Sequence, residues 1–233
     1  MSMGDKIPQK PPMDKRRIRE GYDKIADKVG LTSAFYRDVI KEAGLIQGRV
    51  LDVGCGNGFL LDHIRRQHLG VDVFGCDFSW QLCKNSTNLH QKGIFVQGDG
   101  EELPFLSNIF DAVFITEVLE HIIKPESVLL EIRRVLKPNG KLVLSVPNRD
   151  WFRYDKYVKK RKVFQPIDDH WFTREELKRL LVQSQFEIQS TGGHGSIYFS
   201  QRLLRQLEKK IMFIFPKLRE RMKRLIVVLV NLK

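Results

Sequence analysis

The sequence predicts a single α/β domain with a doubly wound, mostly parallel sheet and helices on both faces. Three observations support this prediction. A short buried strand at 50–53 runs into a glycine-rich turn and then into a helix. Further apolar segments of strand length alternate along the chain with amphipathic helical segments. One of them, at 110–115, is apolar on both faces, as expected for a central parallel strand.

The glycine-rich turn is the most informative stretch of the chain. Gly54, Gly56 and Gly58 alternate with other residues, including Cys55, so that backbone N–H groups can approach a ligand. A dinucleotide site has the spacing G-x-G-x-x-G and holds a pyrophosphate at the helix N-terminus. Here the spacing is G-x-G-x-G, and Asp52 lies two positions before it, where a carboxylate would repel a pyrophosphate but suit a cation. The alternative is a strand–turn–helix that binds no ligand.

The acid and the three glycines resemble D-x-G-x-G-x-G, the first motif of the class I S-adenosylmethionine-dependent methyltransferases, which have a Rossmann-like fold. The cofactor of that family carries an ammonium and a sulfonium group, so an acidic residue suits it. The resemblance implies that Asp52, Gly54, Cys55 and Gly56 contact this cofactor. It covers about residues 18–190 and rests on five phrases in the expected order.

The residues before this motif divide into a leader and two helices. Residues 1–13 are polar and proline-rich, which predicts a disordered leader and not a secretory signal. From 14 to about 43 apolar residues recur at helical spacing, with Thr32 or Ser33 as the cap of a second helix that ends at Gly44. Tyr22 lies in a phrase similar to the Y-D-x-I-A leader of small-molecule methyltransferases. The resemblance places its ring over the cofactor, and a core tyrosine is the competing interpretation.

Two more carboxylates follow the next predicted strands. Asp77 ends the strand that begins after Gly70 and could accept both hydroxyl groups of a ribose, with Phe78 packed on the adenine. The alternative for Asp77 is a cap of the next helix, and the two roles are compatible. Asp99, Gly100 and Glu101 open a phrase that resembles D-x-E-x-L-P-F of the same family. The resemblance implies that Asp99 and Gly100 bind the adenine.

The fourth predicted strand is followed by Thr116, Glu117, Glu120 and His121. In doubly wound sheets, functional sites lie beyond the carboxyl ends of the strands, as these residues do. We expect Thr116 to contact the cofactor. If a helix begins here, Glu117 shares a face with Glu120 or with His121. An N/D-P-P-Y/F turn is absent from this position, which disfavours methylation of a nucleic-acid base nitrogen.

Three roles remain open for this cluster. His121 could act as a general base toward a substrate hydroxyl. Glu117, Glu120 and His121 could hold a divalent metal ion, with His170 as a fourth ligand. The phrase E-x-x-E-H resembles that of quinone-precursor O-methyltransferases and of small-RNA 2′-O-methyltransferases, where it is associated with metal. Alternatively, the acid caps a helix and the histidine packs in the core.

The remaining elements complete the predicted sheet. A helix at 127–136 precedes a fifth strand at 141–146, and Thr173 and Glu176 form a capping box before a helix that leads to a sixth strand at 186–189. Either 197–199 or 225–230 could supply a seventh strand. The methyltransferase domain is thus expected at 14–196.

Residues 149–172 combine aromatic and basic side chains, which predicts a segment that covers the substrate. Its aromatic rings could stack on a ring or face a lipid chain, and its basic residues could meet an anionic headgroup or a carboxylate. Single-stranded nucleic acid is held by the same combination. A lid that only packs on the domain is the alternative.

The net charge of +12 is unevenly distributed. Residues 49–148 hold 10 Lys and Arg against 12 Asp and Glu, whereas residues 202–233 hold 10 against 2. The segment 197–233 is predicted to be basic and amphipathic, with helices that bind an anionic membrane surface or form a dimer contact. A solvated charged face is the alternative. No apolar run reaches the ~18 residues of a membrane span, and the three cysteines cannot form a disulfide framework. Both observations favour the cytoplasm, with peripheral membrane attachment as an option.

The resemblance implies a methyltransferase that uses S-adenosylmethionine. The aromatic segment and the basic tail favour O-methylation of a small lipophilic or membrane-associated molecule. RNA 2′-O-methylation is the first alternative, since the same charges and the same E-x-x-E-H phrase fit it. A protein that binds the cofactor without activity and acts as an interaction module is the second.

Overall fold

The strands form one seven-stranded sheet in a computed structural model, which describes residues 14–28, 31–151, 154–155, 170–194 and 225–232. The strand order is β3-β2-β1-β4-β5-β7-β6. Its members are β1 (Arg49–Val53), β2 (Asp72–Asp77), β3 (Ile94–Gln97), β4 (Phe110–Thr116), β5 (Leu136–Pro147), β6 (Phe186–His194) and β7 (Leu225–Leu232). The pairs among β1 to β5 are parallel, whereas β7 is antiparallel to both of its neighbours. The predicted doubly wound, mostly parallel sheet is therefore confirmed.

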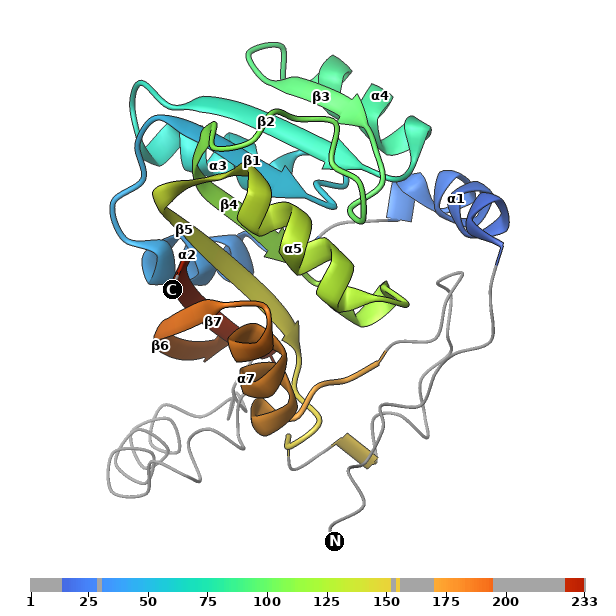
Figure 1. Cartoon of the computed structure of the whole chain (residues 1–233). Coiled ribbons are helices and arrows are strands. Elements are labelled where there is room, and N and C mark those ends of the chain that lie inside the picture. Colours follow the sequence, from blue (N-terminus) through green and yellow to red (C-terminus); the bar gives the residue numbers. More distant parts are fainter. Residues whose placement is uncertain (1–13, 29–30, 152–153, 156–169, 195–224, 233) are drawn as a thin grey trace, which may run out of the picture.

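Helices cover both faces of the sheet (Figure 1). They are α1 (Lys15–Lys24), η1 (Ala26–Lys28), α2 (Ser33–Ala43), α3 (Phe59–Gln67), α4 (Trp80–Leu89), η2 (Leu119–His121), α5 (Pro125–Val135) and α7 (Arg174–Gln183). Side chains alternate along each strand, so Leu51 and Val53 pack with α5 and α7, while Val50 packs with α2 and α3. Each face thus buries its own apolar cluster, and the sheet separates the two.

The predicted helix ends agree with the capping groups. Thr32 caps α2 by accepting a hydrogen bond from the Phe35 N–H at 3.2 Å, and Gly44 ends that helix at a φ of 65°. Thr173 and Glu176 form the predicted capping box at the start of α7. These short polar signals therefore set the helix boundaries in this chain.

The seventh strand corrects the predicted domain limit at residue 196. Leu225–Leu232 forms β7, which lies between β5 and β6, so the sheet extends to the end of the chain. The run is rich in valine and leucine and suits a strand buried on both faces. It is therefore not part of a helical surface anchor. The predicted leader at 1–13, the alternative strand at 197–199 and the part of the predicted basic segment 197–233 that precedes β7 lie outside the described residues.

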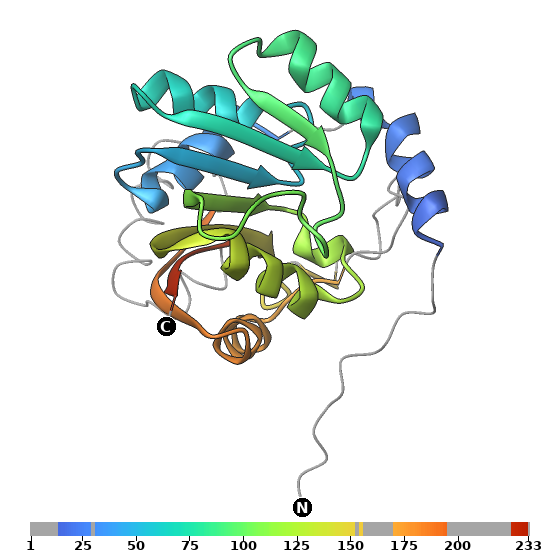
Figure 2. The same ribbon diagram turned by 45° about the horizontal axis from the view of Figure 1, so that its top comes forward.

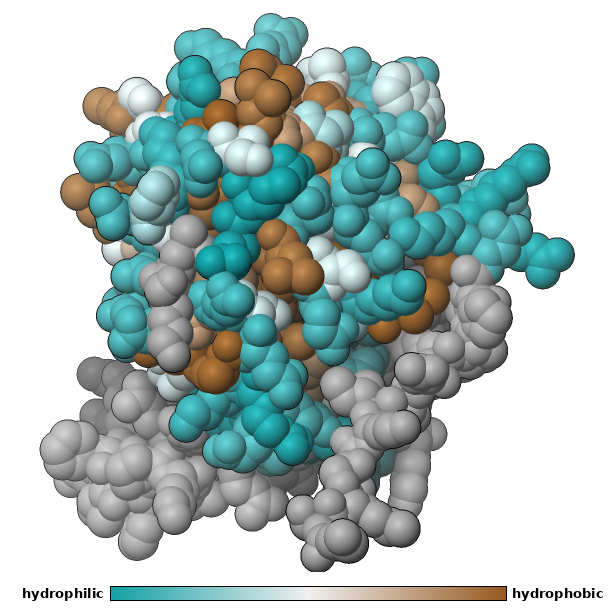
Figure 3. Space-filling model, in the orientation of Figure 1, coloured by the Kyte–Doolittle hydropathy of each residue, from teal (hydrophilic) through white to brown (hydrophobic). Residues whose placement is uncertain are grey.

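The face of the molecule drawn in Figure 3 shows no large apolar patch among the described residues. In Figure 3 apolar groups are small and separated by hydrophilic ones. Large exposed apolar side chains such as Leu69, Leu106 and Trp80 lie on different elements. Among the described helices, none has the length and apolarity needed to cross a bilayer.

Helix α1 lies at the edge of the sheet toward which β1, β2 and β3 point (Figures 1 and 2). Ligands of doubly wound sheets bind at this carboxyl edge. The N-terminal helix therefore lies across the place where the fold predicts a site.

Candidate functional site: an acid-lined cavity at the carboxyl edge of the sheet

A cavity of about 180 Å³ opens at this edge, beneath helix α1. Its wall comes from α1, from the turn after β1, from the loops after β2, β3 and β4, and from the start of α4 and α5. It is lined by Lys15, Ile18, Tyr22, Val53, Gly54, Gly56, Cys76, Asp77, Phe78, Leu82, Gly98, Asp99, Gly100, Glu101, Glu117, Val118, His121, Ile122, Ile123 and Val128. Most of the predicted cofactor residues are therefore brought together. Asp52, Cys55 and Thr116 are not part of the lining.

The glycine turn is tightly wound against the loop that follows β4. Gly54, Gly56 and Gly58 have φ values of 73°, 53° and 74°, in the left-handed region that other residues rarely adopt. A Cβ atom on Gly54 would lie 2.3 Å from Cγ2 of Val118. Only glycine therefore fits at this position, and the backbone of the turn stays exposed to the cavity.

Asp52 lies beneath this turn and does not face the cavity. Its side chain is 2% exposed, and in the described part of the chain its Oδ1 atom has no hydrogen-bond partner. Burial, together with the nearby charge of Asp77, raises its pKa well above the ordinary value. Burial likewise raises the pKa of the Cys55 thiol, so Cys55 is not a ready nucleophile.

Asp77 joins the glycine turn to helix α4. Its Oδ2 atom accepts a hydrogen bond from the Gly56 N–H, and its Oδ1 atom accepts one from the Ser79 N–H, both at 2.9 Å. Burial raises the pKa of Asp77 to about 6, although the backbone hydrogen bonds oppose this. The cap of α4 is Ser79, whose hydroxyl accepts from the Leu82 N–H at 3.1 Å. The alternative prediction, Asp77 as the cap, is therefore wrong.

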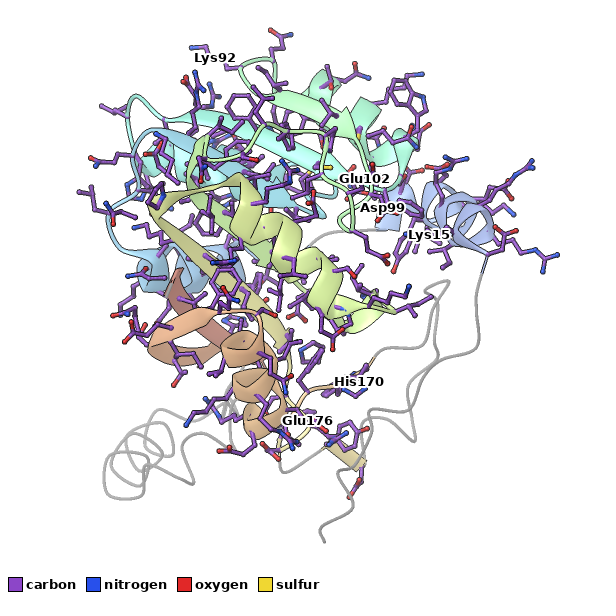
Figure 4. All side chains as sticks on the ribbon, viewed as in Figure 1. Lys15, Lys92, Asp99, Glu102, His170 and Glu176 are labelled. Carbon is purple, nitrogen blue, oxygen red and sulfur yellow. The ribbon has the colours of Figure 1, made fainter. Side chains whose placement is uncertain are left out.

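Asp99 and Glu101 face the cavity together with a lysine that the sequence did not indicate. Lys15 Nζ lies 2.6 Å from Oδ2 of Asp99 and 3.1 Å from Oε2 of Glu101 (Figure 4). Asp99 Oδ1 accepts a hydrogen bond from the Glu101 N–H at 2.9 Å. Burial opposes the charge of Lys15, but the hydrogen bonds to both carboxylates outweigh it and raise the lysine pKa.

Glu117 and His121 line the cavity after β4. Glu117 has a φ of 56°, which is strained for a residue other than glycine. Its Oε1 atom accepts a hydrogen bond from the Ser145 hydroxyl at 3.0 Å. The ring of His121 meets the edge of Tyr22, with ring centroids 6.2 Å apart. No helix begins at Glu117, which precedes a 3₁₀ turn that covers only Leu119–His121, so the condition for a shared helical face is not met.

Part of the sequence that builds this site is similar to a known protein family. A family model described as a methyltransferase domain matches residues 51–144, which include the glycine turn, Asp77, Asp99 and His121. This stretch of the chain is therefore similar to a methyltransferase domain.

Curated relatives are similar to this chain over part of its length. A demethylmenaquinone methyltransferase of Renibacterium salmoninarum is 34% identical over 145 residues, 57% of this chain and 60% of that protein. A ubiquinone biosynthesis O-methyltransferase of Xanthomonas oryzae is 40% identical over 111 residues, 45% of each chain. The chain thus spans roughly half the length of the curated relatives it matches.

Solved structures share the fold of this chain. An S-adenosylmethionine-dependent methyltransferase from Aquifex aeolicus superposes with a TM-score of 0.63 at 17% identity, covering 89% of this chain and 97% of that chain. The predicted class I methyltransferase fold is confirmed.

The charge of the cavity fits the cofactor of this class. Four carboxylates line the cavity, those of Asp77, Asp99, Glu101 and Glu117, and the lining cations are Lys15 and the ionisable His121. A pyrophosphate would be repelled by this wall, whereas the cationic S-adenosylmethionine suits it.

The four tentative metal ligands do not form one metal-binding group among the described residues. Glu120 is 2% exposed, and its Oε1 atom lies 3.8 Å from Nε2 of His121. His170 donates its backbone N–H to the Glu120 carbonyl, and its ring packs on Phe172 at 4.7 Å. Figure 4 shows His170 well apart from Asp99. Within the described ranges, no three His, Cys, Asp or Glu side chains form a group that could hold a metal ion.

Part of the predicted lid belongs to the core instead. Trp171 and Phe172 are 4% and 1% exposed, and Trp171 packs on Tyr154 with ring centroids 5.3 Å apart. Residues 152–153 and 156–169, which include the predicted basic cluster of the lid, lie outside the described residues.

The apolar half of the cavity also escaped prediction. It includes Ile18, Ile122, Ile123 and Val128 from three separate segments. Ile18 and Val128 lie in the helical segments predicted at 14–43 and 127–136, but periodicity does not distinguish a residue that faces a ligand from one that faces the core.

Proposed function

We propose that this chain transfers a methyl group from S-adenosylmethionine to an oxygen atom of a small lipophilic molecule. The observation that supports this best is the composition of the cavity. The lining holds four carboxylates and a glycine turn together with the apolar side chains of Ile18, Ile122 and Ile123, and His121 lies in the same cavity. Such a cavity can hold a cationic cofactor beside an apolar substrate.

The residues that hold the cofactor follow from its parts. Asp77 accepts the ribose hydroxyl groups, while Asp99 and Gly100 bind the adenine, on which Phe78 packs. Gly54 and Gly56 allow close approach of the backbone to the amino-acid portion. Asp52 lies beneath the turn and does not line the cavity.

The reaction needs orientation more than activation. S-adenosylmethionine supplies a methyl group on a sulfonium, which is already a good leaving group. The chain holds the substrate oxygen in line with the methyl group and excludes water with the apolar side chains of α1 and the loop after η2. As the new C–O bond forms and the C–S bond breaks, His121 accepts the proton of the substrate hydroxyl.

The substrate class rests on the cavity and on the relatives. The similar proteins are named for demethylmenaquinone methylation and for ubiquinone biosynthesis, which supports a quinone-like ring as the acceptor. RNA is disfavoured, since its phosphates would meet the four carboxylates of the wall. A catalytically silent module is disfavoured because Glu117 and His121 both reach the cavity. The basic segment at 200–224 is proposed to bring the enzyme to an anionic membrane surface, where lipophilic substrates reside.

The test supplies S-adenosylmethionine with a labelled methyl group to the protein and a cell extract, and then separates organic, aqueous and acid-precipitable fractions. Label in the organic fraction supports the proposal. Nuclease-sensitive label in the precipitate would support RNA instead, and label in the aqueous fraction would contradict a lipophilic acceptor. His121→Asn should lower the transfer about 100-fold. His68→Asn, at the far end of α3, serves as the control.

A further inference from the structure

Helix α1 is attached to the rest of the domain by polar contacts at both ends. Within α1, only Ile18 is buried, so apolar packing contributes little to its position. Ile18 and Tyr22 line the cavity from this helix. The position of α1 therefore decides whether the cavity is closed, and polar side chains at its two ends decide the position of α1.

The first attachment is Lys15. Its ammonium group bridges Asp99 and Glu101, at 2.6 and 3.1 Å, across 84 residues of sequence. The lysine side chain is 51% exposed, so water and salt can compete with this contact. Asp99 is the residue assigned above to the adenine. This attachment is therefore weak enough to open and lies on the cofactor site itself.

The second attachment is Asp23, one residue after the last cavity-lining residue of α1. Its Oδ1 atom accepts hydrogen bonds from the Ser79 hydroxyl at 2.5 Å and from the Gln81 N–H at 3.1 Å. This carboxylate lies at the N-terminus of α4, where the helix dipole favours a negative charge. Ser79 in turn donates its N–H to Asp77. Asp23 thus contacts the residue that orients the carboxylate assigned to the ribose.

A third contact ties the next turn to the glycine motif. The side-chain amide of Asn57 donates to the Ala26 carbonyl at 3.1 Å, and that of Asn85 donates to Asn57 at 3.2 Å. The segment after α1 is thus fixed to α4 and to the glycine turn, while the start of α1 is held by Lys15 alone among the side-chain contacts described across the cavity. The two ends of α1 differ in how firmly they are held.

We propose that Lys15 and Asp23 are positioning residues for cofactor binding, which clamp α1 across the cavity from its two ends. This inference rests on the proposed function. Asp23 is the fixed end, which sets Ser79 and through it the orientation of Asp77. Lys15 is the releasable end, whose contact with Asp99 and Glu101 opens when the cofactor enters or its product leaves.

The two residues should have different kinetic signatures. Lys15→Gln removes the releasable contact, so dissociation of S-adenosylhomocysteine should accelerate about 3- to 10-fold, with a smaller change in association. Asp23→Ala disturbs both α1 and the Ser79–Asp77 pair, so the dissociation constant should rise about 10-fold or more. Asp23→Asn keeps an oxygen for the Gln81 N–H and should recover part of the loss.

The experiment measures association and dissociation rates of S-adenosylhomocysteine with the full-length chain and its variants by stopped-flow fluorescence. Arg16→Gln is the matched control, since Arg16 lies on the same helix and pairs only with Glu20 among the described residues. Thermal melts of the ligand-free proteins check that each variant folds, and Lys15→Gln and Asp23→Asn still decide the matter if Asp23→Ala does not fold.

The outcomes separate this inference from the proposed function. If the wild-type chain binds neither S-adenosylmethionine nor S-adenosylhomocysteine, the proposed function fails. If the wild type binds and Lys15→Gln dissociates at the rate of Arg16→Gln, the releasable clamp is overturned. If Asp23→Ala and Asp23→Asn fold and bind like the wild type, the fixed end is overturned.

Discussion

At the scale of single residues, the site includes two carboxyl groups that the fold buries away from water. Asp52 is the last but one residue of β1 and Asp77 is the last residue of the neighbouring β2, so the parallel register brings both acids beside the glycine turn. Both are buried, at 2% and 8% exposure, and burial raises the pKa of each. Two buried acids side by side disfavour the ligand-free state and favour a ligand that brings positive charge or hydrogen-bond donors.

The raised pKa of Asp77 predicts a pH-dependent stability. The folded chain holds this proton up to about pH 6, whereas the unfolded chain releases it near the ordinary aspartate pKa of 3.8. The contribution of Asp77 to folding is therefore largest below about pH 4 and is lost as the pH rises through about 6, up to roughly 3 kcal/mol. Urea titrations of the ligand-free protein should show this fall, and Asp77→Asn should remove it. An equal pH slope in the variant would contradict the assignment.

Single-residue motifs predicted one half of the site well and the other half poorly. Asp77, Asp99 and Gly100 face the cavity as predicted, because each follows a strand at the carboxyl edge. Lys15 and Asp23 were missed as contacts, since their partners lie 84 and 56 residues away and only the packing of α1 brings them together.

At the scale of elements, short polar signals and apolar runs set the boundaries. Thr32, Ser79 and Thr173 each cap a helix through their hydroxyl groups, and the sequence indicated the first and the last. The sequence offers two candidates for the seventh strand, 197–199 and 225–230. It does not decide between them, because a run of six apolar residues suits a buried strand as well as a surface helix. Strand pairing with β5 and β6 resolves this for Leu225–Leu232.

The capping box of α7 gives a prediction for one helix. Thr173 accepts a hydrogen bond from the Glu176 N–H at 3.2 Å, and Glu176 accepts one from the Thr173 N–H at 2.8 Å. Thr173→Ala should lower the free energy of unfolding by about 1 kcal/mol, because it leaves a donor of the first turn unpaired. Thr173→Ser keeps the hydroxyl and should be nearly neutral. Chemical denaturation distinguishes the two, and equal stability of both variants would count against the cap.

The position of β7 gives a second prediction. Val230 is fully buried and pairs with Leu142 of β5 and Ile188 of β6. Val230→Ala should lower the free energy of unfolding by about 2 kcal/mol through lost burial. The control, Val182→Ala on α7, removes the same atoms from a side chain that is 51% exposed and should change it by less than about 0.5 kcal/mol. Loss of equal size at both positions would place residue 230 outside the core.

At the scale of the whole molecule, charge is segregated. The chain carries a net charge of +12, yet four carboxylates line its cavity. A cationic cofactor is thus attracted to the cavity, while the outer surface favours anionic partners. Composition predicted this segregation only in outline, because residues 49–148 are nearly balanced and the acids gather through the folding of separate strand ends.

The central claim is that this cavity binds S-adenosylmethionine and not a dinucleotide. Isothermal titration calorimetry of the full-length chain with S-adenosylhomocysteine, and in parallel with NAD, tests it most directly. We predict binding of about one equivalent of S-adenosylhomocysteine with a micromolar dissociation constant, and no heat of binding with NAD. Binding of NAD without binding of S-adenosylhomocysteine would contradict both the reading of the glycine turn and the proposed activity.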